Sequence, residues 1–462
     1  MPRLGGSFRD PSGFVFTAGG TLYRQVNRVF ADEFDACTRE GLYDALIGEQ
    51  LLVPHQRVDL SLAATPEAHA VIAPDVVPFV SHPYEWCFGE LRDAALLTID
   101  IQLRALERGF VLRDASAHNV QFAAGRPVFI DTLSFERYRD GAPWAAYQQF
   151  CEHFLVPLAL MATRDSRFGL MLREHLDGIP LQFGSALLPS RTWADPRLLL
   201  HVHLHARAQR RYANATISTE IGGRKLAKSA LVSLVSNLRN AVTALSWRPD
   251  GTEWADYTSA TNYSDASALR KRELVLEYLR RVQPGVVWDL GANTGVYSRI
   301  AREVAPMVVA FDADPAAVER NYRDVRAQSD QGLLPLVLDL KNPSPALGWA
   351  HHERMSLVER GPADTVMALA LVHHLALSGN VPLEDIAAFF ARLGRTLIVE
   401  FVAKVDSQAQ RLLRNRPDIF PDYTSAGFER AFGQYFVIAD CQRVGDAERW
   451  LYLMTRREPP SA

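Results

Sequence analysis

The sequence is poor in cysteine and contains no long apolar run. Its cysteines, Cys37, Cys87, Cys151 and Cys441, are far apart and form no C-x-x-C pair, which disfavours a structural zinc site or a disulfide framework. No uninterrupted apolar stretch approaches the roughly 20 residues that span a bilayer. The opening residues, MPRLGGSFRDPSG, lack the apolar core of a secretory signal. We therefore expect a soluble, cytoplasmic protein.

An excess of charge of one sign is also lacking. The chain has 50 lysines and arginines against 53 aspartates and glutamates, for a net charge of -3. A broad basic face for nucleic acid is therefore not expected. Internal repeats are absent too, and 462 residues predict two or three domains at about 100–200 residues each.

Residues 286–455 alternate short apolar runs with amphipathic stretches. Runs typical of buried strands occur at Val286–Leu290, Met307–Asp312, Leu334–Asp339, Thr365–Val372 and Thr396–Phe401. Amphipathic stretches such as Ala316–Ala327 and Leu383–Leu393 lie between them, and strand-like runs at Tyr435–Ala439 and Trp450–Thr455 follow. This rhythm predicts an α/β fold with a mostly parallel, seven-stranded, Rossmann-like sheet.

A glycine-bearing turn follows the first of these strands. The segment Val286–Leu290 runs into Gly291-Ala292-Asn293-Thr294-Gly295, and a helical pattern begins after it. Ligands of open α/β sheets bind at this carboxyl edge of the strands. The turn lacks the G-x-G-x-x-G of a dinucleotide site. Because Asp289 stands before the first glycine, the turn suits a ligand with a cationic amino group better than a pyrophosphate.

The next two strands also end in aspartate. Asp312 follows the second strand and Asp339 the third. A carboxylate at the tip of the second strand can accept hydrogen bonds from both hydroxyls of a ribose, and one at the third can accept from an adenine amino group. A single aspartate at a strand end is common, whereas three in order beside a glycine turn predict a nucleoside site.

These motifs resemble class I S-adenosylmethionine (SAM)-dependent methyltransferases over residues 254–455. The resemblance implies SAM as the cofactor, with its methionine part surrounded by Asp289, Gly291, Asn293 and Gly295. It further implies that Asp312 holds the ribose and that Asp339 and Leu340 flank the adenine.

Two histidines follow the fourth strand, where the resembling family faces its methyl acceptor. His373 or His374 can act there as a general base; the alternative is that one packs against the strand and the other faces solvent. The place has no N-P-P-Y motif and no Pro-Cys pair. The expected acceptor is an oxygen, nitrogen or sulfur atom of a small molecule or a protein, with neither a nucleic acid nor a membrane as partner.

The N-terminal half carries a second motif. Asp114 and Asn119 have the spacing of H-R-D-x-x-x-x-N, and Asp131 follows a strand-like run. In kinases such residues supply the catalytic Asp and the metal ligands. The segment resembles the protein kinase and small-molecule phosphotransferase superfamily, which implies an α+β two-lobed fold, ATP, and magnesium held by Asn119 and Asp131.

This half departs from the kinase pattern at several points. Arg24 stands where the phosphate-binding lysine belongs, and D-F-G reads Asp131-Thr132-Leu133. Arginine does not replace lysine freely. The open alternatives are an atypical phosphotransferase, a bifunctional enzyme, a pseudokinase-type scaffold, or an unrelated fold.

The predicted organisation is a kinase-like domain at 1–212, a partly helical linker at 213–253 and a methyltransferase domain at 254–462. Within the first domain, strands are expected at Phe14–Thr17, Leu22–Val26 and Val76–Val80. The sequence indicates no oligomeric state and no particular acceptor.

Overall fold

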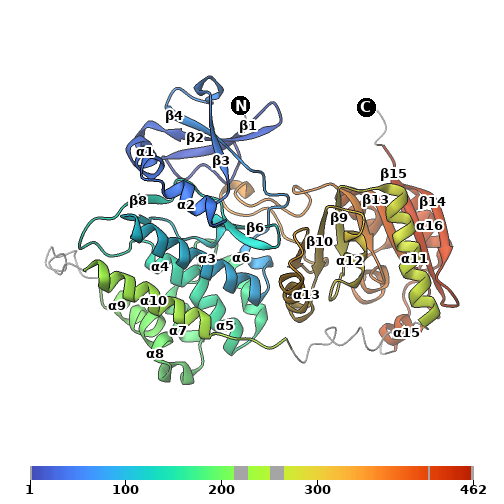
Figure 1. Cartoon of the computed structure of the whole chain (residues 1–462). Coiled ribbons are helices and arrows are strands. Elements are labelled where there is room, and N and C mark those ends of the chain that lie inside the picture. The colour runs from blue at the N-terminus through green and yellow to red at the C-terminus, as the bar shows by residue number, and fades with distance from the viewer. Residues whose placement is uncertain (1–2, 213–226, 250–264, 415–416, 459–462) are drawn as a thin grey trace. The chain divides into compact units, whose positions relative to one another are not determined.

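The computed structural model describes residues 3–212, 227–249, 265–414 and 417–458. Two compact units divide the chain: Met1–Arg248 together with Gly348–Arg354, and Pro249–Leu347 together with Met355–Ala462 (Figure 1). The predicted start of the second domain at 254 lies outside the described residues. Within the predicted linker, Lys228–Ala244 forms helix α10, which belongs to the first unit. Its side chains Leu231, Val235 and Leu238 are buried.

The first unit begins with a four-stranded antiparallel sheet in the order β1-β2-β4-β3. The strands are β1 (Gly13–Ala18), β2 (Thr21–Asn27), β3 (His55–Val58) and β4 (Ala68–Pro74). Ala18 pairs with Thr21, which leaves Gly19 and Gly20 as a two-residue turn in which both have positive φ, as a tight hairpin requires.

Two short two-stranded antiparallel sheets follow the long helix of this unit. They pair β5 (Phe110–Leu112) with β8 (Phe135–Arg137), and β6 (Val120–Ala123) with β7 (Arg126–Phe129). The helices of the unit are α1 (Ala31–Arg39), α2 (Leu42–Gly48), α3 (Phe88–Glu107), α4 (Tyr147–Phe150), α5 (Val156–Thr163), α6 (Met171–Glu174), α7 (Leu181–Leu187), α8 (Pro196–Leu198), α9 (His205–Tyr212) and α10.

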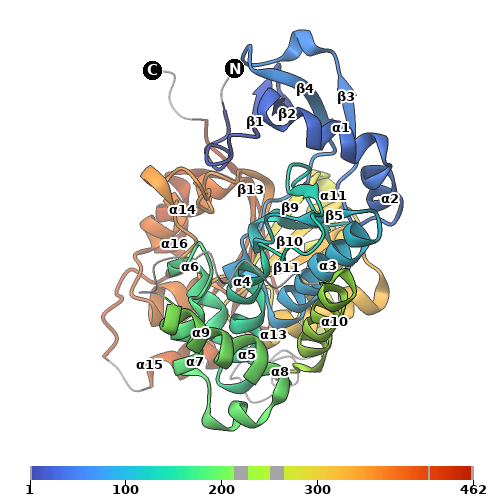
Figure 2. The same cartoon turned by 90° about the vertical axis from the view of Figure 1, so that its left-hand side faces the viewer.

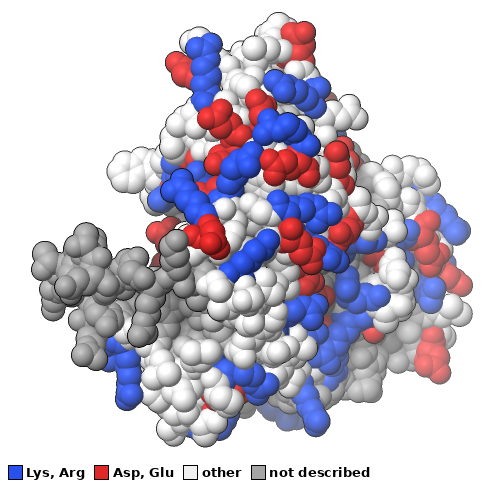
Figure 3. Space-filling view, turned by 60° about the vertical axis from the view of Figure 1, so that its left-hand side comes forward, with Lys and Arg blue, Asp and Glu red and all other residues white. Residues whose placement is uncertain are grey.

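Helices α3 to α10 follow the four-stranded sheet in the chain, and they lie together on one side of it in Figure 2. Helix α3 is largely buried, and its first turn is capped because Glu90 accepts a hydrogen bond from the Cys87 backbone N–H at 2.8 Å. On the face of the molecule in Figure 3, basic and acidic side chains are intermingled over the upper part of the view.

One predicted strand of the first unit is wrong. Val76–Val80 is irregular, and the preceding segment Ala68–Pro74 instead forms β4, which lies between β2 and β3 in the sheet. Pro78 lies within the predicted run and has no N–H to donate to a neighbouring strand. The other two predictions, Phe14–Thr17 and Leu22–Val26, coincide with β1 and β2.

The second unit contains one seven-stranded sheet in the order β11-β10-β9-β12-β13-β15-β14. Its strands are β9 (Val286–Leu290), β10 (Met307–Asp312), β11 (Leu333–Val337), β12 (Ala363–Ala368), β13 (Gly394–Val402), β14 (Phe436–Arg443) and β15 (Arg449–Arg456). The first five are parallel, whereas β15 runs antiparallel between β13 and β14. The mostly parallel seven-stranded sheet is confirmed. The strand order reverses beside β9, which makes its carboxyl end a position where α/β sheets bind ligands.

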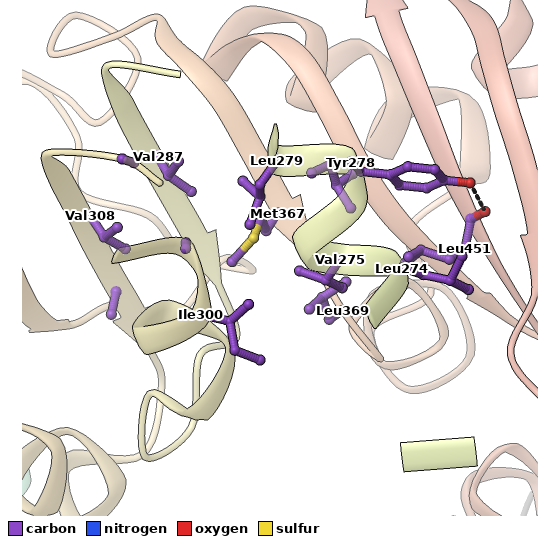
Figure 4. Packing of buried hydrophobic residues seen from close by; sticks show 14 of the residues in the cluster. Leu274, Val275, Tyr278, Leu279, Val287, Ile300, Val308, Met367, Leu369 and Leu451 are labelled. Carbon is purple, nitrogen blue, oxygen red and sulfur yellow. Dashed lines mark hydrogen bonds between the residues drawn. The ribbon is translucent and has the colours of Figure 1, made fainter. Parts of the chain in front are cut away.

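Helices cover both faces of this sheet. They are α11 (Asp265–Val282), α12 (Val296–Arg302), α13 (Pro315–Gln328), α14 (Leu383–Leu393), α15 (Ser407–Leu413) and α16 (Ser425–Gly433). Figure 4 shows Leu274, Val275, Tyr278 and Leu279 of α11 packed with residues of the strands, including Leu451. The next residue of that strand, Tyr452, points to the opposite face because side chains alternate along a strand, and its ring contacts Phe428 of α16.

Strand β12 ends earlier than the sequence predicts. The apolar run Thr365–Val372 indicated one long strand, but β12 stops at Ala368 and Ala370 adopts a φ of 51°. His373 therefore lies in a helical turn, and His374 begins the π-helical segment His374–Ser378. Among the described residues, no helix has the length and apolarity to cross a membrane.

Candidate functional site

The turn after β9 brings backbone and carboxylate together. Asp289 is 2% exposed, and its Oδ2 accepts a hydrogen bond from Ser298 Oγ of α12 at 2.6 Å. Gly291 and Gly295 have φ values of 74° and 80°, a region that glycine enters without strain. A Cβ on Gly295 would lie 2.5 Å from the Asn321 amide. The tight turn therefore requires glycine at this position.

Asp312, at the end of β10, is tied to the same turn. Its Oδ2 accepts the Asn293 backbone N–H at 2.7 Å, and its Oδ1 accepts that of Asp314 at 2.8 Å. The Phe311 carbonyl also accepts the N–H groups of Gly291 and Ala292. Asp312 is thus hydrogen bonded directly to Asn293, and its chain neighbour Phe311 is hydrogen bonded to Gly291. These hydrogen bonds hold three of the predicted residues together.

Burial makes both carboxylates weakly acidic. The pKa of Asp289 is raised to about 6, mainly by burial and further by Asp312, while Ser298 and Lys271 act in the opposite direction. The pKa of Asp312 is also raised to about 6, again mainly by burial, although backbone N–H donors oppose the shift. Two carboxylates close enough to influence one another favour a ligand that brings positive charge or hydrogen-bond donors.

Asp339 and Leu340 lie just beyond β11. The Asp339 side chain is exposed, and its Oδ1 accepts the Lys341 backbone N–H at 2.9 Å. Its neighbour Leu338 donates its backbone N–H to the Asp312 carbonyl at 2.8 Å. Asp339 and Leu340 therefore follow the strand beside Asp312, but among the described residues no side-chain hydrogen bond or ion pair joins them to Asp289 or Asp312.

His373 and His374 occupy different surroundings. His373 is 0% exposed, and both of its ring nitrogens lack a hydrogen-bond partner among the described residues. His374 is half-buried, with its ring centroid 4.2 Å from that of His373. Burial lowers the pKa of His373 well below its ordinary value, and nearby His374, Arg449 and Lys271 lower it further. Burial and Lys341 lower the pKa of His374 to about 4.

Sequence reasoning missed a buried network of charges in the second unit. Lys271 of α11 lies 2.7 Å from Glu400 of β13 and 4.6 Å from the centroid of the Tyr297 ring. Arg449 of β15 binds Asp406 through two nitrogens, at 2.8 and 3.1 Å, and its NH1 is 3.8 Å from Glu400.

A buried charge is rarely retained without a partner. The acidic residue Glu400 inside the otherwise apolar run Leu397–Val402 of β13 was therefore a signal in the sequence. Its partners are too distant along the chain to be recognised without the fold.

The first unit brings its three predicted residues together. Asp114 accepts hydrogen bonds from the Ser116 backbone at 2.9 Å and from Gln149 at 2.8 Å, and Asn119 also hydrogen bonds to it. Burial raises the pKa of Asp114, and Asp131 adds to the rise. Asn119 and Asp131 both contact the Ser134 hydroxyl.

Arg24 forms an ion pair with Asp131, the carboxylate that would bind a metal ion in the kinase pattern. Its NH2 lies 2.5 Å from Asp131 Oδ1, with both side chains largely buried. Leu133 donates its backbone N–H to the same oxygen at 3.0 Å, and Ser134 donates its hydroxyl to Oδ2 at 2.5 Å. Both oxygens of Asp131 thus have protein partners. Within the described ranges, no group of three or more His, Cys, Asp or Glu side chains is arranged to hold a metal ion.

The residues of the second unit fit SAM. The fit rests first on the two glycine positions of the turn: a Cβ added to Gly291 would lie only 3.2 Å from the Leu371 side chain. It rests second on the carboxylates of Asp289 and Asp312, which lie at the ends of adjacent strands. When bound, SAM would supply an electrophilic methyl group.

Fold and site together define a mixed α/β protein whose second unit has a mostly parallel, Rossmann-like sheet with a glycine turn and two carboxylates at its carboxyl edge. No family model matches the chain. The chain is 35% identical over 469 residues to the nodulation protein NoeA of Rhizobium meliloti (strain 1021), and the alignment covers 99% of this chain and 96% of that protein. The chain belongs to the family of this nodulation protein.

Several solved structures resemble less than half of the chain. Magnesium protoporphyrin IX methyltransferase (ChlM) from Synechocystis PCC 6803 is 20% identical, with a TM-score of 0.29 over 41% of this chain and 84% of that one. The N-methyltransferase NodS from Bradyrhizobium japonicum WM9 is 10% identical, with a TM-score of 0.32 over 42% and 99%. The bifunctional kinase-methyltransferase WbdD is 14% identical, with a TM-score of 0.31 over 46% and 45%.

Proposed function

We propose that this protein is a SAM-dependent methyltransferase. The observation that carries the proposal is the link between the glycine turn and Asp312, whose carboxylate accepts the Asn293 backbone N–H at 2.7 Å. In the proposed site Asp289 binds the amino group of the cofactor, Asp312 binds its ribose, and Asp339 with Leu340 flanks its adenine. His373 and His374 stand on the acceptor side.

Calorimetry with S-adenosylhomocysteine, the demethylated product, tests the proposal. Wild-type protein is expected to bind it, and Asp312→Ala is expected to abolish measurable binding. Asp364→Ala is a matched control, because Asp364 lies at the start of β12 and binds the Val286 backbone N–H at 2.9 Å, at the opposite edge of the same sheet. Wild-type protein that binds neither SAM nor S-adenosylhomocysteine would refute the function.

For the first unit we propose a kinase-like accessory role without metal-dependent phosphoryl transfer. The convergence of Asp114, Asn119 and Asp131 supports the kinase-like part of the proposal. The ion pair between Arg24 and Asp131 supports the second part, because a cation already neutralises the carboxylate that would hold magnesium. A pseudokinase-type scaffold fits these contacts better than an active phosphotransferase does.

A further inference from the structure

Ser298 lies in the first turn of α12, directly after the glycine turn that follows β9. The helix begins after Gly295, whose φ of 80° reverses the chain, so the third residue of α12 comes back to the end of the strand. Its side chain is 0% exposed, and its hydroxyl donates to Oδ2 of Asp289 at 2.6 Å. This distance is typical of a hydroxyl that donates to an ionised carboxylate.

The two carboxylates of the site are held in different ways. Both oxygens of Asp312 accept backbone N–H groups, from Asn293 at 2.7 Å and from Asp314 at 2.8 Å. Asp289 accepts from one side chain only, and among the described residues no second hydrogen bond reaches its other oxygen, Oδ1. The hydroxyl of Ser298 therefore orients the Asp289 carboxylate and leaves Oδ1 available to a ligand.

The charged and titratable groups around Asp289 leave Ser298 as its direct partner. Lys271 of α11 also favours the ionised carboxylate, but its ammonium is already bound in the buried ion pair with β13. Asp312 disfavours ionisation, and the charge of Asp289 in turn raises the pKa of Tyr297. Burial raises the pKa of Asp289 to about 6, and Ser298 opposes this rise more than Lys271 does. Without the hydroxyl, the carboxylate would take up a proton closer to neutral pH.

On the basis of the proposed methyltransferase function, in which Asp289 binds the amino group of the cofactor, we propose that Ser298 is the positioning residue for that contact. Its hydroxyl holds Oδ2 and leaves Oδ1 for the ammonium group. The same hydrogen bond keeps Asp289 ionised at neutral pH, which attraction to an ammonium requires. Ser298 thus acts through Asp289 on the amino acid part of the ligand and has no role toward the adenosine part.

Two ligands separate these parts. S-adenosylhomocysteine carries the ammonium group, whereas 5′-methylthioadenosine keeps the adenine, the ribose and the sulfur but has no amino acid part. In calorimetry near neutral pH, Ser298→Ala is expected to bind S-adenosylhomocysteine about tenfold more weakly than the wild type does, because a hydrogen bond to a charged group is lost. Affinity for 5′-methylthioadenosine is expected to stay unchanged. Equal weakening of both ligands would give Ser298 a general structural role and overturn the proposal.

The pH profile of binding is a readout that a purely structural role would not move. Asp289 attracts the ammonium group only when it is ionised, so affinity falls as the pH drops through its pKa, which is about 6 in the wild type. Ser298→Ala should move the midpoint for S-adenosylhomocysteine up by about one pH unit. The profile for 5′-methylthioadenosine should not move. An unchanged midpoint for S-adenosylhomocysteine would overturn the proposal.

A double-mutant cycle tests whether Ser298 acts through Asp289. Asp289→Asn removes the charge and keeps the size of the side chain, so it should weaken S-adenosylhomocysteine binding more than Ser298→Ala does. If the hydroxyl acts only through the carboxylate, Ser298→Ala should cost no further affinity when Asp289→Asn is already present. Additive losses in the double variant would overturn the proposal.

Thr365→Val is the matched control for loss of a buried hydroxyl. Thr365 lies in β12 of the same sheet and is 0% exposed, and its hydroxyl has no hydrogen-bond partner among the described residues. This variant should keep both the affinity for S-adenosylhomocysteine and the midpoint of its pH profile. A shift in Thr365→Val as large as that in Ser298→Ala would overturn the proposal. Wild-type protein that binds neither SAM nor S-adenosylhomocysteine would instead refute the methyltransferase function itself.

Discussion

Arg24 and Asp131 form an ion pair in the first unit, with NH2 and Oδ1 2.5 Å apart and exposed side-chain fractions of 12% and 14%. Arg24 comes from β2 and Asp131 from the segment after β7, so the pair joins the four-stranded sheet to the loop that follows the Asp114 motif. The arginine that departs from the kinase pattern thus has a definite structural partner.

We predict that Arg24→Met lowers the free energy of unfolding by about 2–4 kcal/mol, because it leaves the Asp131 carboxylate largely buried without its counter-ion. The double variant Arg24→Met/Asp131→Asn should recover part of this loss, since no uncompensated charge remains. Urea unfolding of the wild type, Arg24→Met, Asp131→Asn and the double variant measures the coupling energy between the two side chains. Additive losses in the double variant would show that the pair is not coupled.

The same pair predicts that magnesium does not promote nucleotide binding by the wild-type protein. Calorimetric titration with ATP, in the presence and in the absence of magnesium, should show no magnesium-dependent binding. Arg24→Ala frees the carboxylate of Asp131 and should increase magnesium affinity relative to the wild type, while Arg24→Ala/Asp131→Asn should not. Wild-type protein that binds ATP only with magnesium, and loses it in Asp131→Ala, would favour a phosphotransferase.

Cofactor affinity is predicted to fall in acid. Asp289 and Asp312 both have a raised pKa of about 6, so each becomes protonated as the pH falls through that value. Only the ionised carboxylates attract a cationic amino group and accept from both ribose hydroxyls. Calorimetric affinity for S-adenosylhomocysteine should therefore be steady above about pH 7 and weaken below about pH 6. Constant affinity down to about pH 4.5 would contradict this assignment.

Gly295→Ala is predicted to destabilise the second unit by about 1–3 kcal/mol, because the new Cβ would lie 2.5 Å from the Asn321 amide and the residue has a φ of 80°. Gly433→Ala is the control, since a Cβ there would meet nothing within 4 Å and the φ is not positive. Thermal unfolding compares the two. The double variant Gly295→Ala/Asn321→Ala should recover the part of the loss that comes from the clash.

Breaking the buried pair between Lys271 and Glu400 should cost more than breaking an exposed one. Lys271→Met removes the cation 2.7 Å from Glu400, which is 0% exposed, and a loss of about 3–5 kcal/mol is expected. Arg272→Met is a control on the same helix, because its 3.5 Å contact with Glu303 joins two exposed side chains and should contribute less than about 1 kcal/mol. Equal effects in urea unfolding would contradict the role of burial.

Much of the second unit could be predicted because its strands are short apolar runs bounded by polar residues. Val286–Leu290, Met307–Asp312 and Leu383–Leu393 coincide with β9, β10 and α14. The prediction failed after Ala368, where apolar residues continue but the backbone at Ala370 turns to a φ of 51°. Local hydrophobicity reports burial, and it does not report a change of backbone direction inside a buried segment.

The contacts among charges were beyond sequence reasoning for a different reason. Arg24 could be recognised as a departure from the kinase pattern, but its pairing with Asp131 depends on a strand and a loop that are far apart in the chain. The same holds for Lys271, Glu400 and Arg449, which come from α11, β13 and β15. Long-range pairs of this kind follow from the topology of the sheet, which the order of residues along one strand does not reveal.

The first unit is discontinuous in sequence, and this has a practical consequence. It includes Gly348–Arg354, where Glu353 is 7% exposed and lies 2.7 Å from Arg9. A recombinant fragment that stops at Arg248 would omit this segment and deprive Arg9 of its acidic partner. Cloning the two halves separately would therefore yield an incomplete N-terminal piece, so the intact polypeptide is the appropriate material for biochemical work.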